Sequence, residues 1–217
     1  TTDISKGLNL GVYSADLCFT TIFDQTETSC KYIASCKKLA EELSIMDAIS
    51  KNTLDRMEAN TNHKDSLLRI ISEVLLNSDS FLKENERTST AAIVLAGGWI
   101  EGLYIGTQIA KNTKDNKELI NRIADQRFSL ETLMCLLEEQ KEIDANVEPV
   151  LQGIKKINDA FCKIEINKAP VEVITDTTLG KTTLNSATTV TVSPEVFNEI
   201  CNSAESLRTN IVKGELI

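Results

Sequence analysis

Apolar residues recur at the spacing of one helix face along most of the 217-residue chain, and this periodicity limits the fold more than any other feature. The longest predicted segment is 10–43, which holds no proline and no glycine after Gly11. Only three prolines and nine glycines occur, too few for the tight turns of an all-β protein. The predicted helices cover residues 10–43, 44–59, 61–82, 86–112, 115–137, 147–164 and 194–214.

The helical pattern stops after Pro170, where threonine and valine alternate with a period of two. This alternation predicts two short strands, one beginning at Val171 and one ending at Val192. A two-stranded hairpin is marginally stable alone, so we expect it to lie against the helices. We therefore predict a mainly α-helical single domain over residues 1–217, a bundle of about seven helices with a β-hairpin insert at 171–192 before the C-terminal helix.

Three glycines recur every four residues in the predicted helix 86–112, at Gly98, Gly102 and Gly106. Each glycine costs about 1 kcal/mol in a helix relative to alanine, so a compensating contact is expected. The first interpretation is that a neighbouring helix packs closely on these three positions, and a leucine at position 102 would then be strongly destabilising. The alternative is that the bare backbone forms the floor of a cleft for a ligand or a partner segment.

The stretch 91–110 also has the length of a membrane span, and glycines four residues apart are common where membrane helices pack. Glu101 near its centre disfavours that interpretation, as do the amphipathic segments on both sides. Burying a carboxylate among apolar neighbours is costly unless it finds a partner. We therefore expect Glu101 to contact a polar side chain of the first helix, with Tyr13, Asp16 and Thr20 as the candidates.

The polar middle of the first predicted helix has two interpretations. It is either a solvated face, or it meets the glycine-rich helix and forms a polar pocket. In the second case an acidic pair such as Asp16 and Glu101 could do acid–base chemistry if burial separated their pKa values. The candidate ligand-binding residues are Asp16, Thr20, Trp99, Glu101 and Tyr104. No residue is assigned a catalytic role.

The charge balance and the residue composition exclude several kinds of site. A net charge of −9 opposes binding to a phosphate backbone, so no nucleic-acid partner is predicted. The single histidine, His63, falls at a predicted helix start and excludes a multi-histidine metal centre. The segment 179–183 resembles the end of a phosphate-binding loop, but Thr175 stands where that motif requires glycine. We predict no metal and no cofactor.

The six cysteines do not show the spacing of a disulfide framework or of a metal site. Cys30 and Cys36 lie six residues apart on a predicted helix, about 9 Å along its axis, which is too far for a disulfide. We expect most of the cysteines to be free, buried thiols that pack as small apolar groups.

Three segments of the sequence, GVYSADL near the start, LAGGWIEGLY in the middle and TVSPEVFNEI near the end, carry a resemblance that covers nearly the whole chain. The chain resembles a group of bacterial exported helical proteins of the lipoprotein type. The resemblance implies a location in the cell envelope, in the periplasm or attached to the outer membrane, and no known enzymatic activity. It also implies that membrane contact is made only through an N-terminal lipid anchor. Because the first residue is Thr1, we expect a leader to have been removed.

These features favour a non-catalytic helical module of the cell envelope that binds a protein or a small ligand. One alternative is a hydrolase or lyase that uses the carboxylates near the glycine-rich helix. Another is a sensory or scaffold bundle, for which the long first helix is the main indication.

Overall fold

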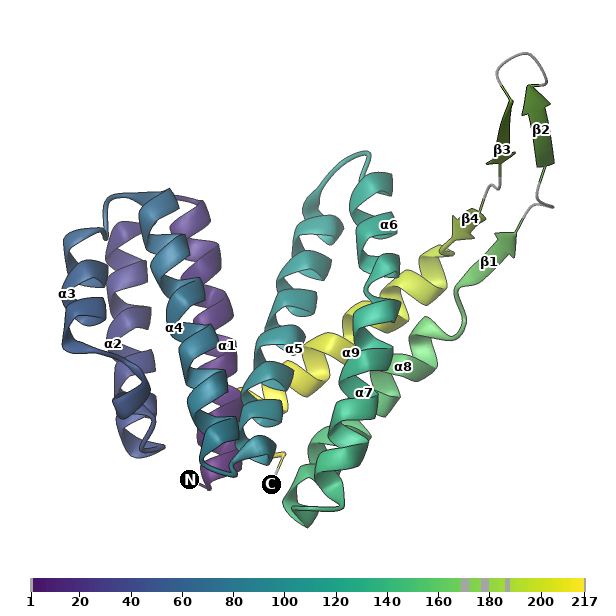
Figure 1. Ribbon diagram of the computed structural model, residues 1–217. Helices are drawn as coiled ribbons and strands as arrows, with labels where there is room; N and C mark the ends of the chain where they lie inside the picture. The colour runs from purple at the N-terminus through teal and green to yellow at the C-terminus, as the bar shows by residue number, and fades with distance from the viewer. Residues whose placement is uncertain (1, 169–171, 177–179, 186–187, 217) are drawn as a thin grey trace.

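Nine α-helices and four short strands make up the part of the chain that the computed structural model describes, residues 2–168, 172–176, 180–185 and 188–216 (Figure 1). The prediction of a mainly α-helical single domain is confirmed. The helices are α1 (Asp3–Ile22), α2 (Thr26–Glu42), α3 (Lys51–Ala59), α4 (Lys64–Glu84), α5 (Thr88–Asn112), α6 (Lys117–Asp125), α7 (Arg127–Lys141), α8 (Glu148–Phe161) and α9 (Pro194–Lys213), with 3₁₀ turns at η1 (Met46–Ala48) and η2 (Ala145–Val147).

The expected single helix over 10–43 is wrong, because the chain reverses at Asp24 between α1 and α2. Asp24 has a φ of 55°, and the Gln25 backbone N–H donates to the Thr20 carbonyl at 2.8 Å. Helices commonly end with this hydrogen-bond pattern, and the residue in the left-handed conformation is then usually glycine. Here Asp24 occupies that position. The sequence therefore gives no glycine signal for the reversal, which lays α2 beside α1.

The expected helix over 115–137 is also two helices, α6 and α7, which meet at Gln126. The Gln126 N–H donates to the Ile123 carbonyl at 2.9 Å, and its own carbonyl accepts from Leu130 at 2.8 Å. The junction thus keeps its hydrogen bonds without a glycine or a proline to mark it. These two divisions explain why nine helices are present where about seven were predicted.

The hairpin is longer than the predicted 171–192 and is built as two successive antiparallel ladders. Strand β1 (Glu165–Lys168) pairs with β4 (Thr188–Thr191), and β2 (Glu172–Asp176) pairs with β3 (Lys181–Asn185). Val171, the expected start of the first strand, lies outside the described residues. Val190 pairs with Ile166, a residue that was assigned to no strand.

The expectation that the hairpin lies against the helices holds only at its base. Val190 and Val192 are partly buried against the main apolar core. The β2–β3 ladder instead extends beyond the ends of the helices (Figure 1). Gly180, with a φ of 61°, directly precedes β3, so the apparent phosphate-loop residues are part of a hairpin and not the start of a helix.

Helix α9 begins and ends where the sequence predicts. The Ser193 Oγ accepts from the Val196 N–H at 3.3 Å, and Pro194 occupies the first helical position, where a missing N–H costs little. Gly214 closes the helix with a φ of 69°, a left-handed conformation that glycine adopts without steric penalty.

Helix α5 lies at the centre of the molecule, with α1–α4 on one side and α6–α9 on the other (Figure 1). Its apolar residues join those of α1, α7, α8 and α9 in the largest buried cluster. By length and composition α5 could also cross a membrane, a test that the core helix of a soluble protein passes as well. In this fold its buried face is covered by α1, α7 and α9.

The close helix contact uses different glycines from the predicted ridge. A Cβ atom on Gly97 would lie 2.2 Å from the Leu8 carbonyl oxygen, and one on Gly11 would lie 2.1 Å from the Val94 carbonyl oxygen. Helices α1 and α5 therefore approach backbone to backbone. Gly98 is the one predicted position at this contact, since a Cβ there would meet the Gly11 oxygen at 3.5 Å.

Gly102 and Gly106 do not pack against a neighbouring backbone, contrary to the prediction. A Cβ on Gly102 meets no atom within 4 Å, and one on Gly106 reaches only a side-chain carbon of Ile123 at 3.9 Å. Gly97 precedes the ridge by one residue, which rotates it by about 100° toward α1. The four-residue spacing places the three glycines on one side of α5, but the face that α1 covers is the one that carries Gly97.

All six cysteines are free thiols, and Cys30 is not bonded to Cys36, as predicted. The expectation that most of them are buried is wrong. Cys201 alone is buried and two are half-buried, whereas three are exposed, namely Cys30, Cys135 and Cys162.

We predict opposite effects for two alanine substitutions in α5. Gly97→Ala should lower the free energy of unfolding by about 3 kcal/mol, because its methyl group meets a backbone oxygen that cannot move away. Gly102→Ala should leave the free energy unchanged or raise it by up to about 1 kcal/mol, through helix propensity alone. Urea denaturation monitored by circular dichroism measures both. Equal effects of the two substitutions would contradict the assigned contact.

Candidate functional site

The side chain of Glu101, on α5, is 1% exposed and is held by an ion pair with α9. The Arg208 Nε donates to its carboxylate at 2.9 Å. The Arg208 guanidinium also stands over the ring of Tyr104, 5.0 Å from the ring centre. Two of the predicted site residues, Glu101 and Tyr104, thus share a partner that the sequence did not suggest.

Asp16, on α1, completes this buried polar group. Its carboxyl group interacts electrostatically with that of Glu101, so the polar contact expected between α5 and the first helix involves Asp16. Tyr32 on α2 also interacts with Asp16, and its ring packs at a tilt against Tyr13, with centroids 5.9 Å apart. The cluster therefore joins α1, α2, α5 and α9, and Tyr32 and Arg208 are the members that sequence reasoning missed.

Burial dominates the acid–base properties of this group. Desolvation raises the pKa of Asp16, against the opposing effects of the Tyr32 hydrogen bond and the Arg208 charge. Desolvation also raises the pKa of Glu101, which the hydrogen bond from Arg208 opposes and the charge of Asp16 reinforces. Because the two carboxyl groups influence each other's pKa, their titrations are coupled.

Desolvation and the neighbouring Asp16 charge raise the pKa of Tyr32 to about 12, so the phenol stays neutral at physiological pH. The Glu101 carboxylate is thus ion-paired with Arg208, and Asp16 is coupled electrostatically to Glu101, Tyr32 and Arg208. Such an arrangement fixes four helices relative to one another. The Glu101 side chain is 1% exposed and so does not face solvent.

Thr20 is buried but does not join the carboxyl cluster. Its Oγ1 accepts from Ser29 Oγ at 3.0 Å and donates to the Leu17 carbonyl at 3.2 Å. It therefore contributes to the packing of α1 on α2, close to the reversal at Asp24.

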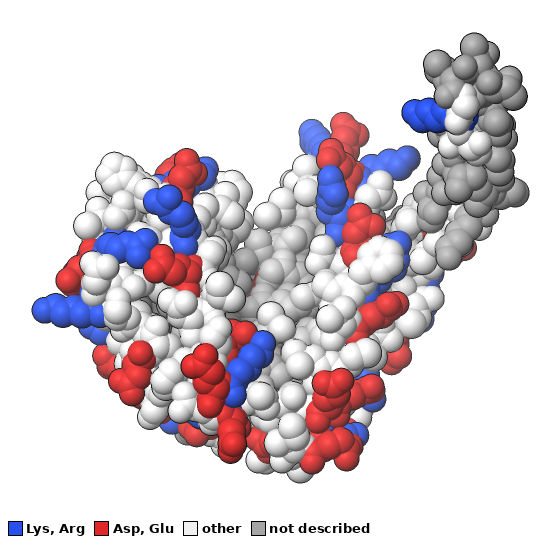
Figure 2. Space-filling model, viewed as in Figure 1, with Lys and Arg blue, Asp and Glu red and all other residues white. Residues whose placement is uncertain are grey.

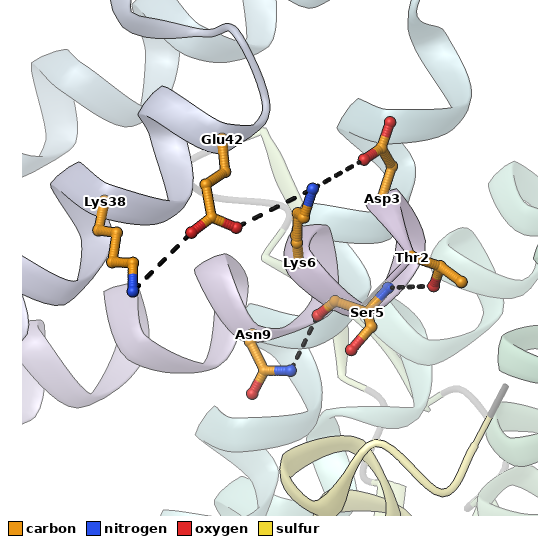
Figure 3. Close-up of polar contacts among 7 residues, drawn as sticks. All are labelled: Thr2, Asp3, Ser5, Lys6, Asn9, Lys38 and Glu42. Carbon is orange, nitrogen blue, oxygen red and sulfur yellow. Dashed lines mark hydrogen bonds and ion pairs between the residues drawn. The ribbon is translucent and has the colours of Figure 1, made fainter.

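A second contact between α1 and α2 lies near the start of α1 (Figure 3). The Lys6 Nζ lies 3.3 Å from an Asp3 carboxylate oxygen and 3.9 Å from a carboxylate oxygen of Glu42. Glu42 also pairs with Lys38 at 4.0 Å. Asn9 donates to the Ile211 carbonyl at 3.4 Å, which connects this end of α1 to α9.

Trp99 belongs to a different part of the molecule from the carboxyl cluster. Its indole Nε1 donates to Ser129 Oγ on α7 at 2.9 Å. The residue also lines a cavity of about 470 Å³ bounded by α1, α2, α3, α4 and α5. The surface is hollowed between the α1–α4 side and the α5–α9 side, with charged side chains on the rims (Figure 2).

The cavity wall is almost entirely apolar. Leucine, isoleucine, valine, alanine and methionine supply most of it, and Leu75 and Leu95 at its margin are 38% and 56% exposed. Asp16, Thr20, Glu101 and Tyr104 do not line it. The predicted site thus divides into a buried carboxyl cluster and an apolar cavity that has Trp99 on its wall.

Two cysteines on the cavity wall remain thiols. Desolvation raises the pKa of Cys36 to about 12 and also raises the pKa of Cys18. Because the thiolate is the nucleophilic form, neither cysteine is suited to covalent catalysis. His63 is exposed at the start of α4, and no group of three His, Cys, Asp or Glu within the described ranges could hold a metal ion.

Comparisons of this chain with protein-family models, with curated proteins and with solved structures find no match.

Replacing Arg208 with methionine should lower the free energy of unfolding by about 3 kcal/mol, because the buried Glu101 carboxylate loses its donor. Arg122→Met is the matched control, since Arg122 is exposed on α6 and should contribute no more than about 0.5 kcal/mol. Urea denaturation at neutral pH compares the two variants. If Arg208→Met unfolds at the same urea concentration as the control, the ion pair does not stabilise the fold.

The carboxyl pair predicts a pH dependence of known sign. Its folded-state pKa values lie above the ordinary values of 3.8 and 4.5, so the folded state binds more protons than the unfolded state. The stability from this pair is complete below those ordinary values and is lost as the pH rises through the folded-state pKa values. We expect Asp16→Asn to make this decline shallower, in urea unfolding measured between about pH 4 and 8. Parallel profiles for the variant and the wild type would contradict raised pKa values for this carboxyl pair.

Proposed function

We propose that this chain is a non-catalytic helical module of the bacterial cell envelope that binds a small apolar ligand in the cavity beside Trp99. The observation that carries the proposal is a cavity of about 470 Å³ with an apolar wall. Its size lies within the range of pockets that hold cofactors and drug-sized ligands.

The energetics of the cavity support binding. Apolar cavities hold water poorly, because the water finds no hydrogen-bond partners. Unfilled apolar space also loses the dispersion contacts that its wall atoms would otherwise make. A ligand that fills the space recovers those contacts and stabilises the folded state by mass action.

The chemistry of the surrounding groups supports binding over catalysis. The thiols of the cavity are protonated, and the carboxyl groups of α1 and α5 lie outside its wall and are engaged by Arg208 and Tyr32. The acid–base hydrolase or lyase would need these carboxyl groups to face a substrate. The assignment to the cell envelope rests on the resemblance of the three sequence segments described above.

A larger side chain on the α1 wall of the cavity tests the proposal, because it should occupy the space that the ligand needs. We expect the neutral fluorophore N-phenyl-1-naphthylamine to bind the wild type with increased emission and to raise its melting temperature. Ala15→Phe places a ring in the cavity and should weaken this binding by about tenfold or more.

Ala34→Phe provides the control, because Ala34 is exposed on α2 and does not line the cavity. It should bind the fluorophore as the wild type does. The proposal is wrong if the wild type does not bind the fluorophore, or if folded Ala15→Phe binds it as tightly as Ala34→Phe does.

A further inference from the structure

The length of the cavity suits an extended apolar molecule. Its α4 wall runs from Ile71 to Leu82, about 16 Å along the helix axis at 1.5 Å per residue. An extended hydrocarbon chain can therefore lie along the α4 wall of this cavity.

Two charged residues lie on the otherwise apolar wall, Lys37 of α2 and Asp79 of α4. Asp79 is neutralised by Lys83, whose Nζ lies 2.7 Å from its carboxylate oxygen. Lys37 makes no ion pair with any residue that the structure describes. The uncompensated charge on the wall is therefore a single positive one.

We propose that the natural ligand is a single-chain fatty acid, whose hydrocarbon tail fills the cavity and whose carboxylate pairs with Lys37. This inference rests on the proposed function and assigns its ligand class. The net charge of −9 opposes an anion at long range, but charges are screened beyond about 8 Å at physiological ionic strength. The ammonium group of Lys37, in direct contact with the head group, therefore decides which head group binds most tightly.

Three amphiphiles with the same hydrocarbon tail and different head groups distinguish the contribution of the head group to the affinity from that of the tail. They are dodecanoate, dodecanol and dodecyltrimethylammonium. Each is titrated below its micelle concentration at pH 8, with the fluorescence of Trp99 as the signal, because this is the only tryptophan and it lines the cavity. We expect the wild type to bind dodecanoate about three- to fivefold more tightly than dodecanol, as one partly exposed ion pair provides. Dodecyltrimethylammonium should bind most weakly.

Lys37→Gln should bind dodecanoate and dodecanol equally, while its affinity for dodecanol stays that of the wild type. Lys37→Glu should reverse the order and favour dodecyltrimethylammonium. Lys38→Gln is the matched control, because Lys38 adjoins Lys37 on α2 but pairs with Glu42 and does not line the cavity. It should keep the preference for dodecanoate.

The outcomes distinguish the two proposals. If none of the three amphiphiles binds, the fatty-acid assignment is wrong, and the proposed function is wrong as well if N-phenyl-1-naphthylamine also fails to bind. If dodecanol binds as tightly as dodecanoate to the wild type, or if Lys37→Gln keeps the preference, the apolar cavity stands and the fatty-acid assignment is overturned.

Discussion

The rest of the structure depends on the backbone contact between α1 and α5. Gly11 and Gly97 leave no room for a Cβ atom on either helix at this contact, so the two axes come as close as their main chains allow. The close approach brings Asp16 and Glu101 together farther along the same two helices. Two carboxyl groups in one buried place would repel each other, and the fold compensates with the positive charge of Arg208, which is ion-paired with Glu101.

The carboxyl cluster and the cavity are two results of the same arrangement. Helix α1 contacts α5 closely, and the apolar faces of α2, α3 and α4 leave about 470 Å³ unfilled beside that contact. The polar groups of the interface lie where four helices converge and satisfy one another. The apolar side chains are left around an unfilled space, and for this reason the cavity is the better candidate for a binding site.

Much of the secondary structure and part of the site follow from the sequence. The apolar stripes predicted the helices, and Ser193, Pro194 and Gly214 marked the ends of α9 through local hydrogen bonds and backbone preferences. The reversal at Asp24 was missed because an aspartate occupies the position that glycine usually marks. A partner for Glu101 was predicted from the cost of burying a carboxylate, but Arg208 lies 107 residues away along the chain and no local pattern connects them.

The sequence by itself determined which segments are helical, where α9 begins and ends, and that Glu101 needs a partner, because these depend on neighbouring residues and on the cost of desolvation. Only the tertiary structure decided which glycine face of α5 meets α1, since Gly97 and Gly98 differ by one residue and the choice depends on the contacts of the whole helix. It also decided that Trp99 lines a cavity and that Lys37 lies beside it. The space between helices is set by how their side chains pack, and residues far apart in the sequence determine that packing.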